Sequence, residues 1–197
     1  MAHLPRFVKS ALGPETYPPH EGVEFAFLGA SNSGKSTLVN ALLGTKLCKT
    51  SSKPGHTSLL NFFEVKKGLY FVDLPGYGFA KKSKKEQKIW QDAIEVFLMD
   101  RPNLALCYVL FDLKRGLLQS DIGLLEWLGQ NEIPYALLAT KIDKLNQKDR
   151  SKALKTIKGQ GVGAELIQTS SVKKTGIKEI WAHIEALREI SASQNAH

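Results

Sequence analysis

The chain carries at residues 29–36 the stretch Gly29-Ala30-Ser31-Asn32-Ser33-Gly34-Lys35-Ser36, which fits the phosphate-binding pattern G-x-x-x-x-G-K-[ST]. An apolar run over residues 23–28 predicts a buried strand before it, and leucines at helical spacing follow it. Because glycine permits backbone conformations that a Cβ would obstruct, the N–H groups of the loop can converge on phosphate oxygens at the positive end of the next helix. This strand-to-helix setting favours a nucleotide phosphate site over a glycine-rich turn with a chance lysine.

Two side chains of this loop are expected to reach the nucleotide and its metal. Lys35 is placed for the β- and γ-phosphates, and the Ser36 hydroxyl for Mg²⁺. All eight residues, 29–36, are therefore candidate nucleotide-binding residues.

Composition and charge limit the class of protein. With 197 residues, 43% hydrophobic and 23% charged, the chain is expected to form one globular domain. No apolar run approaches the roughly 20 residues that span a bilayer, and residues 1–12 lack an apolar signal core, so we expect a cytoplasmic protein without a membrane partner. The net charge of +8 predicts a polyanionic partner, with nucleic acid as the first candidate and simple solubility as the alternative.

Strand and helix patterns alternate through most of the chain and predict an α/β fold. We expect an irregular lead-in over residues 1–22, a single domain over 23–190 and a disordered tail over 191–197. A three-layer phosphate-loop fold follows, with helices on both faces of a mostly parallel sheet that has one antiparallel strand. Besides the first strand and helix, the patterns predict an antiparallel hairpin over 60–72, a basic loop over 81–88, strands over 104–111, 135–139 and 166–167, and helices over 89–97, 122–128, 147–159 and 177–187.

A second motif, Asp73-Leu74-Pro75-Gly76, closes a predicted strand about 40 residues after the phosphate loop. A carboxylate at the position of Asp73 can hold Mg²⁺, and the N–H of Gly76 can sense a γ-phosphate. The pattern D-x-x-G alone is usually a turn, but its spacing from the phosphate loop favours the functional interpretation.

The polar segment 45–58 lies between these two motifs and predicts a nucleotide-dependent switch. The Thr57 hydroxyl is a third candidate Mg²⁺ ligand beside Ser36 and Asp73, against the alternative of an ordinary loop threonine. Its neighbours are further candidate nucleotide contacts: Gly55, His56, Ser58 and Leu59.

The tetrapeptide Thr140-Lys141-Ile142-Asp143 follows a predicted buried strand and indicates guanine recognition. A carboxylate at Asp143 can accept hydrogen bonds from N1–H and the 2-amino group of guanine, which adenine cannot supply. Lys141 can pack along the base. Backbone N–H groups of Thr169-Ser170-Ser171, at the end of the last strand, are candidate partners of the guanine O6.

In this order the motifs resemble a translation-factor-type small GTPase, and longer stretches resemble the EngB family of bacterial GTPases over about residues 7–187. These stretches are residues 29–36, 53–57, 60–63, 73–78 and 170–176. The resemblance implies a single GTPase domain that uses GTP and Mg²⁺, a role in large-ribosomal-subunit assembly, and a requirement for normal cell division and septation.

The hydrolytic machinery is expected to be weak in isolation. Many small GTPases place glutamine after D-x-x-G to orient the attacking water, whereas this chain has Tyr77. Asn32 lies where some related GTPases use asparagine to hold K⁺, although it could equally serve only to brace the loop. Lys35, Thr57, Gly76 and Asn32 are therefore the candidate catalytic residues.

The partner and two rival functions complete the expectations. Five lysines after the D-x-x-G turn predict a contact with ribosomal RNA, against the alternative of a solvated switch loop: Lys81, Lys82, Lys84, Lys85 and Lys88. Lys148, Lys152 and Lys155 on one helix face are expected to be solvated, with RNA contact as the alternative. We expect a monomer. An ATP-dependent enzyme and an RNA-binding module that uses nucleotide only structurally remain as alternatives.

Overall fold

The computed structural model describes residues 4–48, 59–77, 84–161 and 163–194. Within these ranges a seven-stranded sheet has the strand order β1-β3-β4-β2-β5-β6-β7. The strands are β1 (Arg6–Ala11), β2 (Val23–Gly29), β3 (Leu60–Lys66), β4 (Leu69–Asp73), β5 (Leu104–Asp112), β6 (Tyr135–Thr140) and β7 (Leu166–Gln168).

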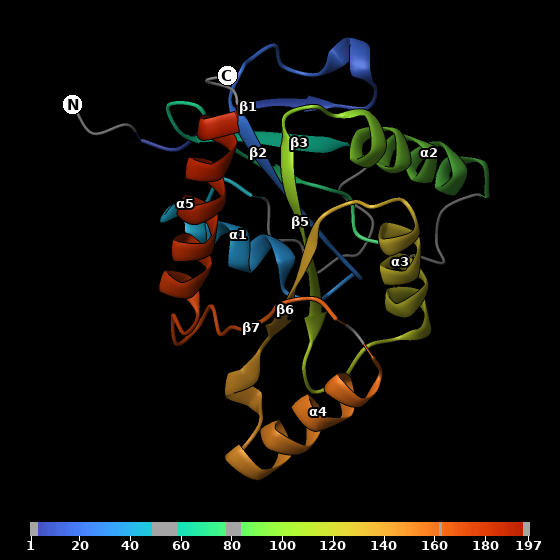
Figure 1. Cartoon of the computed structure of the whole chain (residues 1–197), viewed down its shortest axis with the longest axis vertical. Helices are drawn as coiled ribbons and strands as arrows, with labels where there is room; N and C mark the ends of the chain where they lie inside the picture. Colours follow the sequence, from blue (N-terminus) through green and yellow to red (C-terminus); the bar gives the residue numbers. More distant parts are fainter. Residues whose placement is uncertain (1–3, 49–58, 78–83, 162, 195–197) are drawn as a thin grey trace.

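Helices cover both faces of this sheet (Figure 1). The α-helices are α1 (Lys35–Leu43), α2 (Lys84–Asp100), α3 (Gln119–Gln130), α4 (Gln147–Gly159) and α5 (Ile177–Gln194), and short 3-10 helices are η1 (Pro14–Thr16) and η2 (Ile142–Lys144). Helices α1 and α5 share a core with Phe25 and Phe27 of β2, whereas α2, α3 and α4 bury their apolar sides on the opposite face. The predicted three-layer fold is therefore confirmed.

The directions of the strands agree with the predicted sheet, which is mostly parallel with one antiparallel strand. Strand β3 pairs antiparallel with both β1 and β4, so it alone among the described strands runs against the rest. The pairs β2–β4, β2–β5, β5–β6 and β6–β7 are parallel. The carboxyl ends of β2, β4, β5, β6 and β7 consequently meet at one edge, where open parallel sheets bind their ligands.

Three local predictions are wrong. The lead-in is not irregular throughout, because Arg6–Ala11 forms edge strand β1 against β3. The predicted basic loop ends earlier, since helix α2 begins at Lys84. The predicted disordered tail is helical up to Gln194, where α5 ends.

A buried ion pair attaches the stretch after η1 to the sheet. Glu24 of β2 is fully buried, and Arg101 donates to it at 2.7 Å through Nη2 while also reaching the Pro18 carbonyl. The His20 ring contacts the same carboxylate at 2.9 Å and stacks on Tyr70. Among the described residues, no helix combines the length and apolar character needed to cross a bilayer.

Candidate functional site

The phosphate loop lies between the end of β2 and the start of α1. Gly34, at the helix N-cap, has a φ of 97°, which a side chain would strain. A Cβ at Gly29 would lie 2.6 Å from the Leu110 carbonyl and 2.7 Å from Ser33 Oγ. Both glycines therefore keep the loop tight and leave the N-terminal end of α1 facing the sheet edge.

Lys35 and Asp73 bring the first two motifs together. Their ammonium and carboxylate groups form a direct contact, and both side chains are almost fully buried. Asp73 is the last residue of β4, and Leu74 and Pro75 after it are buried as well. A buried lysine can exchange a carboxylate partner for phosphate oxygens, so this pair marks the place of the predicted phosphate and metal site.

The D-x-x-G turn continues alongside the phosphate loop. Ser31 N–H donates to the Tyr77 carbonyl at 3.2 Å, and Ala30 and Tyr77 form a parallel bridge. Gly76, between Pro75 and Tyr77, packs against the loop, because a Cβ there would lie 3.2 Å from the Gly29 carbonyl.

The guanine motif is linked to the phosphate loop by two side chains. Thr140 Oγ1 donates to the Ser33 carbonyl, and Lys141 Nζ donates to the Asn32 carbonyl at 2.6 Å. Lys141, with a φ of 58°, also pairs with Asp112 at 2.9 Å. Asn32 itself has a φ of 65° and an exposed side chain.

Asp143 lies in η2 beside the segment that follows β7. The Ser170 hydroxyl donates to Asp143 Oδ1 at 2.5 Å, and this bond is the main cause that lowers the pKa of Asp143 below its ordinary value. Ser170 is held in turn, because its backbone pairs with Thr175 and its Oγ accepts from Lys173 N–H. Thr169 N–H donates to the Ala139 carbonyl, and Ile142 N–H donates to the Thr169 carbonyl. The two segments predicted to contact the base, 140–143 and 169–171, are therefore neighbours.

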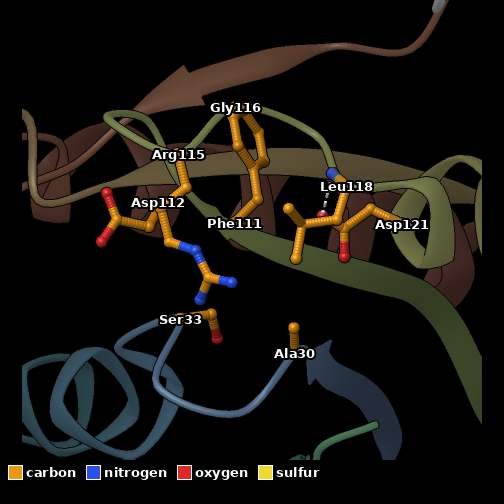
Figure 2. A pocket seen from close by; sticks show the side chains of 8 residues that line it. All are labelled: Ala30, Ser33, Phe111, Asp112, Arg115, Gly116, Leu118 and Asp121. Carbon is orange, nitrogen blue, oxygen red and sulfur yellow. Dashed lines mark hydrogen bonds between the residues drawn. The ribbon is translucent and has the colours of Figure 1, made fainter. Parts of the chain in front are cut away.

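A recess lies between the phosphate loop and the connection from β5 to α3 (Figure 2). Arg115 extends across it toward Ser33, whose buried hydroxyl has no hydrogen-bond partner among the described residues. A buried hydroxyl without a partner, in a recess that an arginine also lines, fits a loop that could hold an anionic group.

Part of the predicted site lies outside the described residues: Gly55, His56, Thr57 and Ser58. Leu59 is described, immediately before β3, and is 38% exposed. Ser36 is the second residue of α1, and Ser171 follows Ser170 after β7.

The sequence interpretation missed three residues that support the site. Asp112, at the end of β5, anchors Lys141, and Asp121 of α3 accepts from the Tyr77 hydroxyl at 2.7 Å. Asn40 of α1 donates through Nδ2 to the Cys48 carbonyl and accepts through Oδ1 from Cys48 N–H, both at 2.8 Å. These bonds hold Cys48, which precedes Thr57 in the chain. Asp112 carried a usable signal, because a carboxylate at the end of a buried strand faces the ligand edge.

Comparison with known proteins identifies the kind of site. A family model described as 50S ribosome-binding GTPase matches residues 24–141. The chain is 43% identical over 191 residues to the probable GTP-binding protein EngB of Acidobacterium capsulatum, covering 93% of this chain and 90% of that protein. It is 45% identical over 188 residues to the EngB protein of Desulfatibacillum aliphaticivorans, covering 94% and 92%.

Solved structures agree with these sequence matches. A crystal structure of a probable GTP-binding protein EngB superposes with a TM-score of 0.67 at 25% identity, covering 85% of this chain and 99% of that one. Era in complex with MgGDPNP and nucleotides 1506–1542 of 16S ribosomal RNA has a TM-score of 0.62 at 28% identity, covering 84% of this chain and 56% of Era.

Proposed function

Because this chain belongs to the EngB family of GTP-binding GTPases, we propose that it acts as a GTP-hydrolysing switch in assembly of the large ribosomal subunit, and that normal cell division and septation depend on it. The observation that carries the proposal is the meeting of the phosphate loop, Asp73–Gly76 and the 140–143 motif at one sheet edge.

The phosphates are assigned to the loop 29–36, with Lys35 moving from Asp73 to the β- and γ-phosphates. Two facts support this. The ammonium is buried beside a carboxylate, and the loop is built on two glycines, one where a Cβ would clash (Gly29) and one with a positive φ (Gly34). The proposed nucleotide contacts also include Gly55, His56, Ser58, Leu59, Leu74 and Pro75.

The oxygen donors at this edge suit Mg²⁺, which prefers carboxylate, hydroxyl and phosphate oxygens. Ser36 and Asp73 would hold the ion together with Thr57. When bound, Mg²⁺ neutralises charge that develops on the phosphates. The Lys35–Asp73 contact supports this assignment, because it places the Asp73 carboxylate beside the first turn of α1.

The base is assigned to Asp143, Lys141 and residues 169–171. The hydrogen bond from Ser170 lowers the pKa of Asp143 and so favours the ionised carboxylate, the form that can accept from two guanine donors. An ATP-dependent enzyme would lack this acceptor, so measured preference for GTP over ATP decides between the two.

The polyanionic partner is assigned to RNA of the large subunit. The net charge of +8 supports it, as does helix α4, which carries Lys148, Arg150, Lys152, Lys155 and Lys158 against the single acid Asp149. We further propose that the protein works in the cytoplasm, as a monomer and without a membrane partner.

Cosedimentation with ribosomal subunits tests the proposal. We expect the protein to sediment with the large subunit in a non-hydrolysable GTP analogue and to be released in GDP. GTP turnover should rise when particles are added, which an RNA-binding module with a merely structural nucleotide would not show. Equal sedimentation with both subunits in either nucleotide would contradict the proposed switch.

A further inference from the structure

Tyr77, the residue after the D-x-x-G turn, is held through both its main chain and its side chain. Its carbonyl accepts from Ser31 N–H at 3.2 Å, and its hydroxyl donates to Asp121 Oδ1 at 2.7 Å. The ring is partly buried and packs against the core on the α3 face of the sheet. Tyr77 therefore joins the phosphate loop to Asp121 of α3, which lies 44 residues after Tyr77 in sequence.

Asp121 is a buried carboxylate at the start of α3, only 1% exposed. Its second oxygen accepts from Leu118 N–H at 2.8 Å, the bond drawn in Figure 2. The first turn of a helix favours a negative charge, which explains how a carboxylate is tolerated there. Burial, and then the bond to Asp121, raise the pKa of Tyr77, so its hydroxyl stays a donor.

Gly76 is the turn residue next to this anchored tyrosine. A Cβ on Gly76 would lie 3.2 Å from the Gly29 carbonyl and 3.4 Å from Ser31 Oγ. Gly76 therefore lies against the phosphate loop, and the bonds of Tyr77 fix the chain immediately after it.

We propose that Tyr77 and Asp121 are positioning residues for GTP, because their hydrogen bond holds Gly76 against the phosphate loop before the nucleotide arrives. The inference rests on the proposed role of Gly76 as the sensor of the γ-phosphate. Pre-ordering the turn lowers the ordering cost of binding a triphosphate. GDP has no γ-phosphate for Gly76, so its affinity does not include this contribution.

The test is a comparison of GDP affinity with the affinity for a non-hydrolysable GTP analogue, both with Mg²⁺. Tyr77→Phe should weaken the GTP analogue by roughly three- to tenfold, as expected when the net contribution of one typical hydrogen bond is lost, and leave GDP within about twofold. Asp121→Ala should have the same effect. Asp121→Asn should restore most of the discrimination, because its amide can still accept from Leu118 N–H and donate to the tyrosine oxygen.

Tyr108→Phe is the matched control. It also removes a buried tyrosine hydroxyl, which lies 3.1 Å from His183 Nδ1. Tyr108 belongs to β5 and faces the side of the sheet that α1 and α5 cover. This variant should change neither affinity. Thermal melting of every variant separates a loss of folding from a loss of the preference for the GTP analogue over GDP.

The outcomes distinguish this inference from the assignment on which it rests. If Gly76→Ala leaves the ratio of the two affinities unchanged, Gly76 does not sense the γ-phosphate, and both ideas fail. If Gly76→Ala changes the ratio but Tyr77→Phe and Asp121→Ala do not, or lower both affinities equally, only the positioning role is wrong.

Discussion

The Ser170 hydroxyl lies 2.5 Å from Asp143 Oδ1 and donates a hydrogen bond to it. The two residues come from the segments after β7 and β6, which are adjacent parallel strands. The bond fixes the direction of the Asp143 carboxylate and lowers its pKa. The carboxylate that we propose to read the base is thus oriented by a side chain that is 27 residues away in sequence.

The first prediction concerns the choice of base. Asp143→Asn should weaken GTP by about 100-fold or more, because two charge-assisted hydrogen bonds to guanine are lost or weakened. Xanthosine triphosphate should bind better than to the unaltered protein, since the new amide can donate to its 2-oxo group. Competition against a fluorescent nucleotide measures both, with Asp149→Asn on α4 as the control. An unchanged preference would remove Asp143 from the base site.

The second prediction concerns acid pH. A depressed pKa in the folded protein means that the ionised Asp143 contributes stability above its ordinary pKa, and that this contribution is lost as pH falls through the folded value. Ser170→Ala removes the main cause of the depression, so the Asp143 pKa should rise. An NMR titration of its carboxyl carbon measures this shift. No change would show that the hydrogen bond does not control the charge of Asp143.

The third prediction concerns hydrolysis. The Tyr77 hydroxyl is bonded to Asp121 and cannot also orient an attacking water as glutamine does elsewhere, so intrinsic turnover should be slow. If Asn32 helps to hold K⁺, turnover in K⁺ should exceed turnover in Na⁺ several-fold, and Asn32→Ala should abolish the difference. Phosphate release in the two buffers measures both effects. Equal rates would leave Asn32 as a loop brace only.

The fourth prediction concerns the ribosomal contact. Replacement of Lys81, Lys82, Lys84 and Lys85 by alanine should weaken large-subunit binding and flatten its salt dependence, because fewer counterions are released. GTP affinity should barely change, since the phosphate contact is proposed for Lys35 and not for these four lysines. Cosedimentation over a salt series measures the slope.

The lysines of α4 provide the comparison for this fourth experiment. Alanine at Lys148, Lys152, Lys155 and Lys158 removes the same number of charges from a helix face that is exposed at all four positions. If this variant loses the salt slope and the Lys81–Lys85 variant keeps it, the RNA contact lies on α4 instead.

The sequence predicts features that are encoded in a few consecutive residues, and it does not predict those that depend on contacts between residues distant in sequence. The phosphate loop, Asp73–Gly76 and the 140–143 motif are local patterns whose chemistry is contained in a few consecutive residues. Edge strand β1 was missed because its polar and apolar residues become a strand only through pairing with β3, about 50 residues away. The bonds of Asp112 and Asp121 to Lys141 and Tyr77 likewise depend on which strand ends and helices meet in space.

The last prediction concerns the stability of the fold. Glu24 is fully buried, and Arg101 holds its carboxylate through Nε and Nη2 at 2.7–3.1 Å. Arg101→Ala should lower the free energy of unfolding by about 3–5 kcal/mol, because it leaves a buried charge that only His20 faces at close range among the described residues. Glu24→Gln in the same chain should recover part of this loss, since the uncompensated charge is removed.

Lys88→Ala is the control for this last experiment, because it breaks the exposed Lys88–Asp92 pair, whose expected contribution is about 0–1 kcal/mol. For a chain of this length the Arg101→Ala loss corresponds to a fall of roughly 6–20 °C in Tm. Chemical denaturation in which the dependence of the unfolding free energy on denaturant concentration is unchanged would confirm that the stability of the folded state has changed, and not the compactness of the unfolded chain. A loss no larger than that of Lys88→Ala would mean that the Glu24–Arg101 pair does not stabilise the attachment of residues 17–22 to the sheet.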